Sequence, residues 1–292
     1  MTLRTLLQGT RLGDVLPWGG VALLGAMQAR GGWQGLDLAT AVAGVLTVLG
    51  LALFAFLFND LCDRNENRRE NRPDRSLASG AFPLWLGIGL AGSGAALALT
   101  GPLVLGNSFV MTWSLASLAL GAAYSAPWPR LKCRAGLASL THVIQGTLAF
   151  ALPAWLARGQ LDPAAAVAGV WFGLVFAAGH LHHEVLDLAA DQAAGTRTLA
   201  VRRGGRTALW LGFALFASAA IWSSWLALAG RTASWWGWTQ LGMFLAYAMG
   251  FAYFTRGRPD PAGVRRLRQL YRISYLAGGA LLLAASWHGG AG

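Results

Sequence analysis

The sequence predicts an all-α, polytopic membrane protein, and its composition, its apolar segments and its charge distribution support this prediction. Only 12% of the 292 residues are charged and 55% are apolar, whereas about a quarter of the residues in a soluble domain are charged. Apolar segments of the length that crosses a bilayer, roughly 20 residues, recur along the chain. We expect nine transmembrane helices around a central cavity, capped by cytoplasmic loops, in one domain covering residues 1–292.

The expected spans are apolar runs that contain few charges. They cover about 12–29, 38–58, 83–100, 102–124, 137–156, 164–183, 207–228, 234–254 and 270–287. Pro17 interrupts the first run, and the third and fourth runs almost merge. The longest polar stretches, about 59–82, 187–206 and 255–269, each follow an even-numbered span and therefore lie at one membrane face. These three stretches are the expected functional loops.

The distribution of positive charge predicts the orientation. A net charge of +11 would suggest nucleic acid as the partner of a soluble protein. With the N-terminus inside, however, nineteen Lys and Arg residues lie in inner segments and only Arg30, Arg158 and Arg231 lie in outer loops. Such a bias marks the cytoplasmic side. We therefore expect lipid rather than nucleic acid as the partner, in a membrane such as the prokaryotic inner membrane.

Acidic residues are concentrated in two short stretches that each follow an apolar run. Eight of the twelve acidic residues lie within 59–74 or 184–191. If the second span continues as a helix, Asn59, Asp63 and either Glu66 or Asn67 share a face. The residues in the second stretch, Glu184, Asp187 and Asp191, have the same spacing of three and four.

Oxygen ligands in this arrangement suit Mg²⁺, which binds proteins through a few carboxylates together with substrate phosphates. Bound metal would neutralise charge on a diphosphate leaving group. A second interpretation is that the acids only pair with neighbouring arginines on a solvated face. That interpretation does not explain why both stretches repeat one pattern after even-numbered spans, so we favour the metal site.

Three segments resemble motifs of the UbiA superfamily of intramembrane prenyltransferases. Asn59-Asp60-x-x-Asp63, with Arg72-Pro73-Asp74-Arg75 downstream, resembles the first aspartate-rich motif of that family. Glu184-x-x-Asp187-x-x-x-Asp191, followed by Gly195 and Thr198-Leu199, resembles the second. The segment from Tyr124 to Lys132 resembles a loop of the family that lies between the two motifs. The resemblance covers the whole chain and implies a nine-helix prenyltransferase that uses Mg²⁺.

The motifs depart from the family pattern at a few positions. Asn67 stands where the first motif has its third aspartate, and Glu184 replaces the first aspartate of the second motif. Ser76 stands where proline is usual. The amide of Asn67 is a weaker metal ligand than a carboxylate, so the number of metal ions that the first motif binds stays open.

The resemblance implies a role for each matched residue. The expected metal ligands are Asn59, Asp60, Asp63, Glu184, Asp187 and Asp191. The expected diphosphate-binding residues are Arg72, Arg75, Arg130, Lys132 and Arg197. The expected catalytic residues are Asp63, Asp187, Asp191 and Tyr124, and possible acceptor contacts are His180, His183 and Asn67. We interpret the histidines as polar lining rather than as metal ligands.

The implied reaction is prenyl transfer from a prenyl diphosphate to an electron-rich acceptor within the membrane, through an allylic carbocation. The acceptor is expected to be a small hydrophobic molecule, an aromatic compound or quinone precursor, because Ala194-Gly195-x-Arg197-Thr198-Leu199 is closer to the naphthoquinone-type branch. One alternative is a terpene cyclase of the same superfamily. Another is a non-enzymatic transporter or binder of an anionic lipid, with the acids as a cation site.

Overall fold

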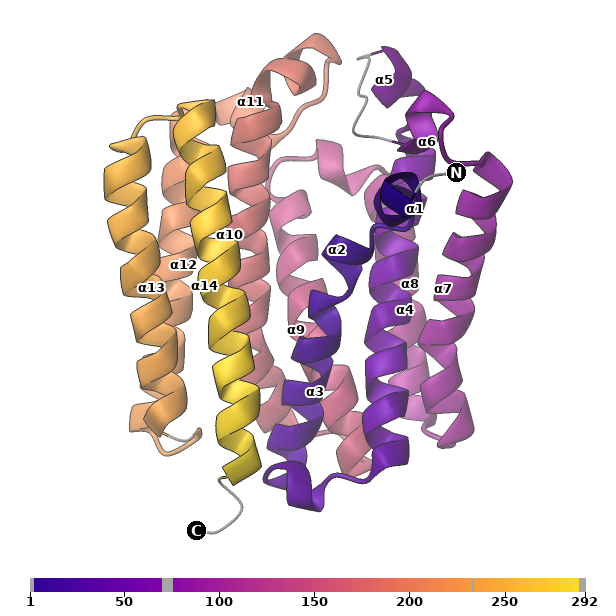
Figure 1. The fold of residues 1–292 in the computed structure, drawn as a ribbon, viewed down its shortest axis with the longest axis vertical. Helices are drawn as coiled ribbons and strands as arrows, with labels where there is room; N and C mark the ends of the chain where they lie inside the picture. Colours follow the sequence, from indigo (N-terminus) through magenta and orange to yellow (C-terminus); the bar gives the residue numbers. More distant parts are fainter. Residues whose placement is uncertain (1–2, 70–75, 233, 289–292) are drawn as a thin grey trace. The chain divides into compact units, whose positions relative to one another are not determined.

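The described part of the chain folds into helices joined by turns and short connections. The computed structural model describes residues 3–69, 76–232 and 234–288, and within these ranges it contains helices and turns but no strand (Figure 1). The described part has nine helices of fourteen residues or more: α3 (Pro17–Arg30), α4 (Leu38–Cys62), α7 (Leu84–Val104), α8 (Ser108–Ser125), α9 (Leu137–Arg158), α10 (Pro163–Ala193), α12 (Gly205–Leu228), α13 (Ser234–Thr255) and α14 (Pro261–His288). The all-α architecture and its nine long helices are confirmed.

Five of the described helices are long and apolar enough to cross a membrane. They are α4, α7, α9, α10 and α12, with mean hydropathy between 1.3 and 2.5 over their most apolar windows. Short helices accompany the long ones: α1 (Leu3–Gly9), α2 (Leu12–Val15), α5 (Arg64–Arg69), α6 (Ser76–Ser79) and α11 (Leu199–Arg203). The protein is therefore a polytopic, all-helical membrane protein.

Several helix boundaries differ from those expected from hydropathy. The last helix begins at Pro261 rather than near residue 270, because arginine lowers hydropathy but is a good helix former. The carboxylate of Asp260 caps this helix by accepting a hydrogen bond of 2.8 Å from Gly263 N. Likewise α10 continues to Ala193. The stretches 187–206 and 255–269, expected as loops, are therefore largely helical.

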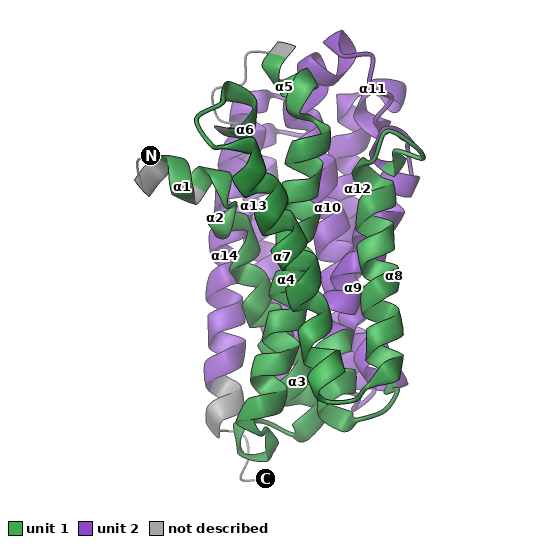
Figure 2. Ribbon diagram, turned by 90° about the vertical axis from the view of Figure 1, so that its right-hand side faces the viewer, with its two compact units in different colours: residues 1–131, 152–162 green, residues 132–151, 163–292 purple. Residues whose placement is uncertain are grey.

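The helices form two compact units. Unit 1 comprises residues 1–131 and 152–162, and unit 2 comprises residues 132–151 and 163–292 (Figure 2). The boundary passes through α9, whose first part belongs to unit 2. The first acidic stretch lies in unit 1 and the second in unit 2. The assignment of the chain to a single domain stays a prediction.

In unit 1, glycines bring the backbones of α4 and α7 together. A Cβ on Gly94 of α7 would lie 2.8 Å from Phe54 N and 3.0 Å from Gly50 O of α4. Gly101 meets Ala43 O in the same way. Small residues of this kind allow membrane helices to approach closely.

At its start α4 is capped by Asp37, which accepts a hydrogen bond of 2.8 Å from Thr40 N. Hydrogen bonding to Thr40 lowers the pKa of Asp37. These contacts fix α4, which has the first acidic stretch at its other end.

In unit 2, an aromatic core surrounds the middle of α10. Phe216, Tyr247 and Tyr271 project from α12, α13 and α14 and are buried. His182 of α10 is fully buried among them, with Nε2 3.2 Å from Tyr247 Oη and its ring stacked on Phe216. On another side of α10, Gly173 packs on Gly146 of α9. This packing fixes the rotation of α10 and therefore the direction of the acidic residues that follow.

Candidate active site

The first acidic stretch lies where α4 passes into α5. Helix α4 ends at Cys62, Asp63 follows as its C-cap, and α5 begins at Arg64. Helical spacing nevertheless continues, because Asp63 N donates to Asn59 O and Asn67 N donates to Asp63 O, each at 2.9 Å. The expected continuation of the helix is confirmed apart from the break at Asp63. Asn59, Asp63 and Asn67 therefore follow one another at intervals of one turn.

The oxygen atoms at the end of α4 have partners within unit 1. Asp60 is only 8% exposed, and its Oδ2 lies 3.6 Å from Nε of Arg11. The side chain of Asn59 accepts a hydrogen bond of 3.0 Å from Ser125 Oγ at the end of α8. Tyr124 precedes Ser125 in the last turn of α8 and is half-buried. The resembling loop therefore begins directly beside the first motif.

Arg130 belongs to this cluster. Its Nη2 lies 2.6 Å from both carboxylate oxygens of Glu66 and 3.8 Å from Asp63 Oδ1. A partly exposed pair of this kind adds little to stability, but it sets the charge around the motif. Arg130, which is expected to bind diphosphate, therefore already neutralises carboxylates of the first stretch. Glu66 is the carboxylate that it binds most closely.

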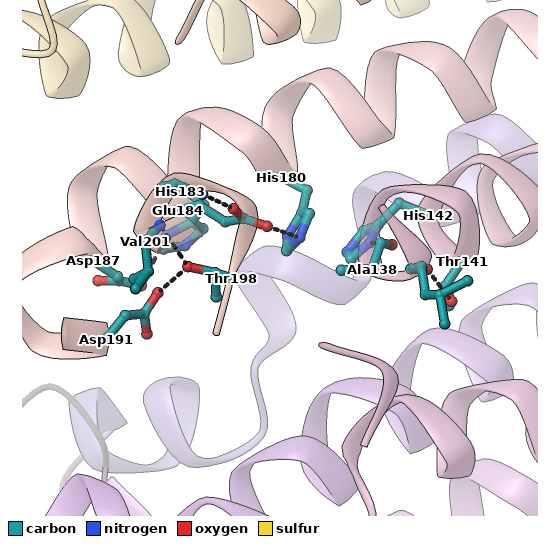
Figure 3. Close-up of polar contacts among 12 residues, drawn as sticks. Ala138, Thr141, His142, His180, His183, Glu184, Asp187, Asp191, Thr198 and Val201 are labelled. Atoms are coloured by element: carbon teal, nitrogen blue, oxygen red, sulfur yellow. Dashed lines mark hydrogen bonds and ion pairs between the residues drawn. The ribbon is translucent and has the colours of Figure 1, made fainter. Parts of the chain in front are cut away.

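The acidic residues of the second stretch all lie on α10 (Figure 3). Glu184 is 4% exposed, and its Oε2 accepts a hydrogen bond of 2.9 Å from Ala200 N. Its Oε1 lies 3.0 Å from His180 Nε2, one turn earlier on the helix. Asp187 is more exposed and lies 3.3 Å from His183 Nδ1. The expected spacing along one helix is confirmed, but the three acids have different surroundings.

The segment after α10 folds back onto its acidic residues. Gly195 has φ +69°, a conformation that glycine adopts without strain. Thr198 caps α11 by accepting a hydrogen bond from Val201 N at 3.4 Å, and its hydroxyl donates to Asp191 Oδ2 at 3.2 Å. The Gly-x-x-Thr-Leu pattern in the sequence therefore forms a turn and a cap whose polar groups face α10.

The histidines of unit 2 form two environments. The His180 ring stacks on His142 of α9, with centroids 3.9 Å apart and planes at 13°. His142 Nδ1 lies 2.7 Å from Ala138 O, which places a proton on that nitrogen. His182 instead belongs to the buried core, off the face of the acids, as expected. Sequence reasoning missed His142, although it is the only histidine in the apolar run 137–156.

A cavity of about 620 Å³ opens beside α11 in unit 2. Its lining residues are Cys133, Arg134, Arg197, Val201 and Arg202. Three of them are arginines and none is acidic, so the residues around this cationic cavity carry net positive charge, and arginine is a residue type that binds phosphate and diphosphate groups. Arg197 was expected to bind an anion, whereas Arg134 and Arg202 were not singled out. Lys132 is partly buried in the 3₁₀ turn η2 (Leu131–Cys133) that leads to this cavity.

The donor atoms fit Mg²⁺. Among the described residues no group of three or more His, Cys, Asp or Glu side chains is arranged to hold a metal ion by itself. Each motif nevertheless offers two aspartates, and the first adds the amide oxygen of Asn59. Mg²⁺ commonly binds through one or two carboxylates, with water and substrate phosphates completing its coordination. The predicted anion-binding residues Arg72 and Arg75 lie outside the described residues.

The fold and these motifs define a class: helical membrane proteins with acidic motifs at the ends of membrane helices. A model of the UbiA prenyltransferase family matches residues 20–276. The chain therefore belongs to the UbiA prenyltransferase family, and it is a transferase. The prediction made from the three motifs is confirmed.

Relatives of known structure share the fold. An apo UbiA homolog from Aeropyrum pernix K1 superposes with a TM-score of 0.72 at 19% identity, covering 94% of this chain and 97% of the other. A UbiA homolog from Archaeoglobus fulgidus, bound to GPP and Mg²⁺, gives a TM-score of 0.70 at 20% identity, covering 94% and 99%. In sequence, a digeranylgeranylglyceryl phosphate synthase from Thermococcus kodakarensis is 29% identical over 236 residues, 78% of this chain and 79% of that protein.

Proposed function

We propose that this protein catalyses Mg²⁺-dependent transfer of a prenyl group from a prenyl diphosphate to an acceptor in the membrane. The observation that carries the proposal is the pair of acidic motifs at the ends of α4 and α10, in a chain whose family is that of prenyltransferases. The homolog bound to GPP and Mg²⁺ supports the choice of donor and metal. The active site is proposed to lie at the cytoplasmic face of a prokaryotic inner membrane.

In this proposal the aspartates bind the diphosphate through metal. Asp60 and Asp63, with Asn59, would act from α4, and Asp187 and Asp191 from α10. Bound Mg²⁺ would stabilise the negative charge that develops on the leaving diphosphate. Glu184 was also expected to be a ligand, but it is 4% exposed and its Oε2 already accepts a hydrogen bond from Ala200 N.

Basic side chains would bind the remaining diphosphate oxygens. Arg197 lines the cationic cavity, and Lys132 lies in the turn leading to it. Arg130 would interact with both Glu66 and the diphosphate. Arg72 and Arg75, which follow the first motif, are also proposed to bind the diphosphate. With the diphosphate held in this way, the allylic C–O bond ionises and the acceptor captures the carbocation. Catalysis then consists of electrostatic stabilisation, positioning and exclusion of water. Tyr124, which precedes Ser125 at the end of α8, is proposed to contribute to that positioning.

Two acceptor classes have support. The second motif favours an aromatic compound or quinone precursor, and His180 and His183 would contact it together with Asn67. The relative from Thermococcus kodakarensis is a digeranylgeranylglyceryl phosphate synthase, which makes a glyceryl phosphate a second candidate. Membership of the prenyltransferase family argues against the transporter, and a terpene cyclase stays as the alternative reaction.

Product analysis separates these candidates. Purified protein would be incubated with Mg²⁺ and GPP or a longer prenyl diphosphate, together with a quinone precursor, a glyceryl phosphate or no acceptor. Mass spectrometry would identify the product, and diphosphate release would give the rate. A prenylated acceptor supports the transferase and identifies its acceptor class. A cyclic hydrocarbon formed without acceptor would establish the cyclase, and the absence of diphosphate release under all conditions would refute the proposal.

A further inference from the structure

Glu184 differs from the other acids of the second stretch in its surroundings. It is 4% exposed, whereas the side chain of Asp187 is 31% exposed. One carboxylate oxygen accepts a hydrogen bond from Ala200 N inside unit 2, and the other lies 3.0 Å from His180 Nε2 without forming a hydrogen bond. The bond to Ala200 connects α10 to a residue sixteen positions along the chain. A carboxylate that is 4% exposed and has one oxygen bonded to Ala200 N is poorly placed to bind a metal ion that also contacts a substrate.

The hydrogen bond from Ala200 N to Glu184 supplies an acceptor for a backbone N–H group in the first turn of α11. The first N–H groups of any helix have no partner within that helix. Thr198 supplies an acceptor for Val201 N, and Glu184 supplies one for Ala200 N. A hydrogen bond from a backbone N–H to a charged carboxylate is stronger than one between neutral groups. Glu184 therefore caps α11 from a distance, and the Thr198 hydroxyl adds a second connection to Asp191.

This connection determines where the basic side chains of the segment lie. Arg197 precedes the capped turn and Arg202 follows it, and both line the cationic cavity. Without a partner for Ala200 N, α11 would have to move or expose that group to water, and the two arginines would move with it. Arg134, which also lines the cavity, belongs to the segment before α9 and does not depend on this bond. The bond from Ala200 N to Glu184 therefore bears on where Arg197 and Arg202 lie.

We infer that Glu184 is a positioning residue, which anchors α11 to α10 and holds Arg197 and Arg202 at the cavity, and that it does not bind the metal ion. The role of Arg197 toward diphosphate rests on the proposed function. The anchoring does not, because it concerns only contacts within unit 2. The inference assigns two roles within the second motif: Glu184 is the anchor, and Asp187 and Asp191 are the proposed metal ligands.

Hydrogen exchange tests the anchor without any turnover. Amide exchange at residues 199–201 would be measured in nanodiscs for the wild type and for three substitutions, Glu184→Gln, Glu184→Asp and Glu184→Ala. Glutamine keeps an oxygen at the same reach, whereas aspartate keeps the charge but is one methylene shorter. We expect exchange to rise roughly tenfold or more in the Asp and Ala variants, and less in the Gln variant. Asp187→Asn, one turn along the same helix, is the matched control and should leave these amides unchanged.

Metal binding is the second readout. Mn²⁺ titrations followed by electron paramagnetic resonance, with Mn²⁺ as the probe, should give the same midpoint for Glu184→Gln as for the wild type. Asp187→Asn should raise the midpoint. A raised midpoint in Glu184→Gln together with unchanged exchange at 199–201 would overturn the inference, since Glu184 would then be a ligand. Unchanged exchange in both the Asp and Ala variants would also overturn it. If Glu184→Ala fails to fold, the Asp and Gln variants still decide the outcome.

Steady-state kinetics distinguish positioning from a purely structural role. Displaced arginines should weaken donor binding, so Glu184→Asp should raise KM for GPP by about tenfold while kcat changes less, and Glu184→Gln should restore most of the loss. A fall in kcat alone, without rescue by glutamine, would contradict the positioning role. Absence of any turnover in the wild type would refute the proposed function and leave the exchange and Mn²⁺ results to decide the anchor.

Discussion

Asp63 and Asp187 are the acids of the two stretches that the proposal depends on most. Asp63 is the C-cap of α4 and lies 3.8 Å from a guanidinium nitrogen of Arg130, whereas Asp187 lies near His183 on α10. Neither is enclosed as Glu184 is. The side chain of Asp63 is 16% exposed and that of Asp187 is 31% exposed, against 3% for Glu184.

The first prediction is that Asp63→Ala and Asp187→Ala each reduce Mg²⁺-dependent turnover by at least about 10²-fold, the scale of a lost electrostatic contact in an active site. The measurement is diphosphate release by protein that remains folded in detergent. Asp162→Ala is the control, because Asp162 pairs with Arg158 in the connection after α9. Near-normal rates in both motif variants would favour acids that only pair with arginines on a solvated face.

The second prediction concerns Asn67, which lies one turn beyond Asp63. A carboxylate here would add one negative charge to the first motif, and affinity for a hard cation rises with the number of charged oxygens. Asn67→Asp should therefore lower the Mg²⁺ concentration that gives half-maximal activity. Glu66→Gln should leave it nearly unchanged, because Arg130 already neutralises Glu66. A lower affinity in Glu66→Gln, with no change in Asn67→Asp, would show that Glu66 supplies the missing charge.

At the scale of elements, the contact between α4 and α7 positions the first motif. Backbone atoms of α4 lie so close to Gly94 that a single added carbon would collide with Phe54 N. Gly92 lies two residues earlier on the same helix, and a Cβ there would meet nothing within 4 Å. The close contact with α4 therefore requires glycine at position 94 but leaves room for a larger residue at position 92.

The third prediction follows from that difference. Gly94→Ala should destabilise the protein by about 1–3 kcal/mol, the usual cost of overpacking, because backbone cannot yield as a flexible side chain can. Gly92→Ala should be neutral or stabilising by up to about 1 kcal/mol, since alanine favours helix more than glycine does. Unfolding in detergent, followed by tryptophan fluorescence, measures both. Equal stability of the two variants would show that α4 and α7 do not pack through Gly94.

At the scale of the whole molecule, charge and the number of helices together predict the topology. Nineteen basic residues lie in the segments expected inside, including those after α4 and α10. Nine long helices in the described residues make an odd number of crossings if each one spans the bilayer. Positive residues stay on the cytoplasmic side during insertion.

The fourth prediction is therefore a cytoplasmic N-terminus and a C-terminus on the opposite side. Reporter fusions that are active on only one side of the membrane, placed at each end, should give opposite signals. A fusion after residue 196, between α10 and α11, should report the cytoplasm. Two termini on one side would show that one of the long helices does not cross.

The number and type of the elements could be predicted from sequence because they depend on local properties. The apolar residues from 38 to 58 are favoured away from water, whatever the rest of the fold. In lipid, where no water is available, their backbone N–H and C=O groups are hydrogen-bonded by forming a helix. The acids at Asp60, Asp63, Asp187 and Asp191 were found because their spacing repeats a helical period. Hydropathy failed at α14, which begins at Pro261, because it measures transfer to lipid and not helix formation.

What each acid does was decided only by tertiary structure. Glu184 and Asp187 are three residues apart on one helix and look alike in sequence. Packing of His182 into the aromatic core rotates α10 so that Glu184 meets Ala200 N, whereas Asp187 stays partly exposed. The pairing of His142 with His180 and that of Arg130 with Glu66 likewise join residues 38 and 64 positions apart. Such contacts depend on how helices pack, and no local pattern in the sequence specifies which distant backbone group will need an acceptor.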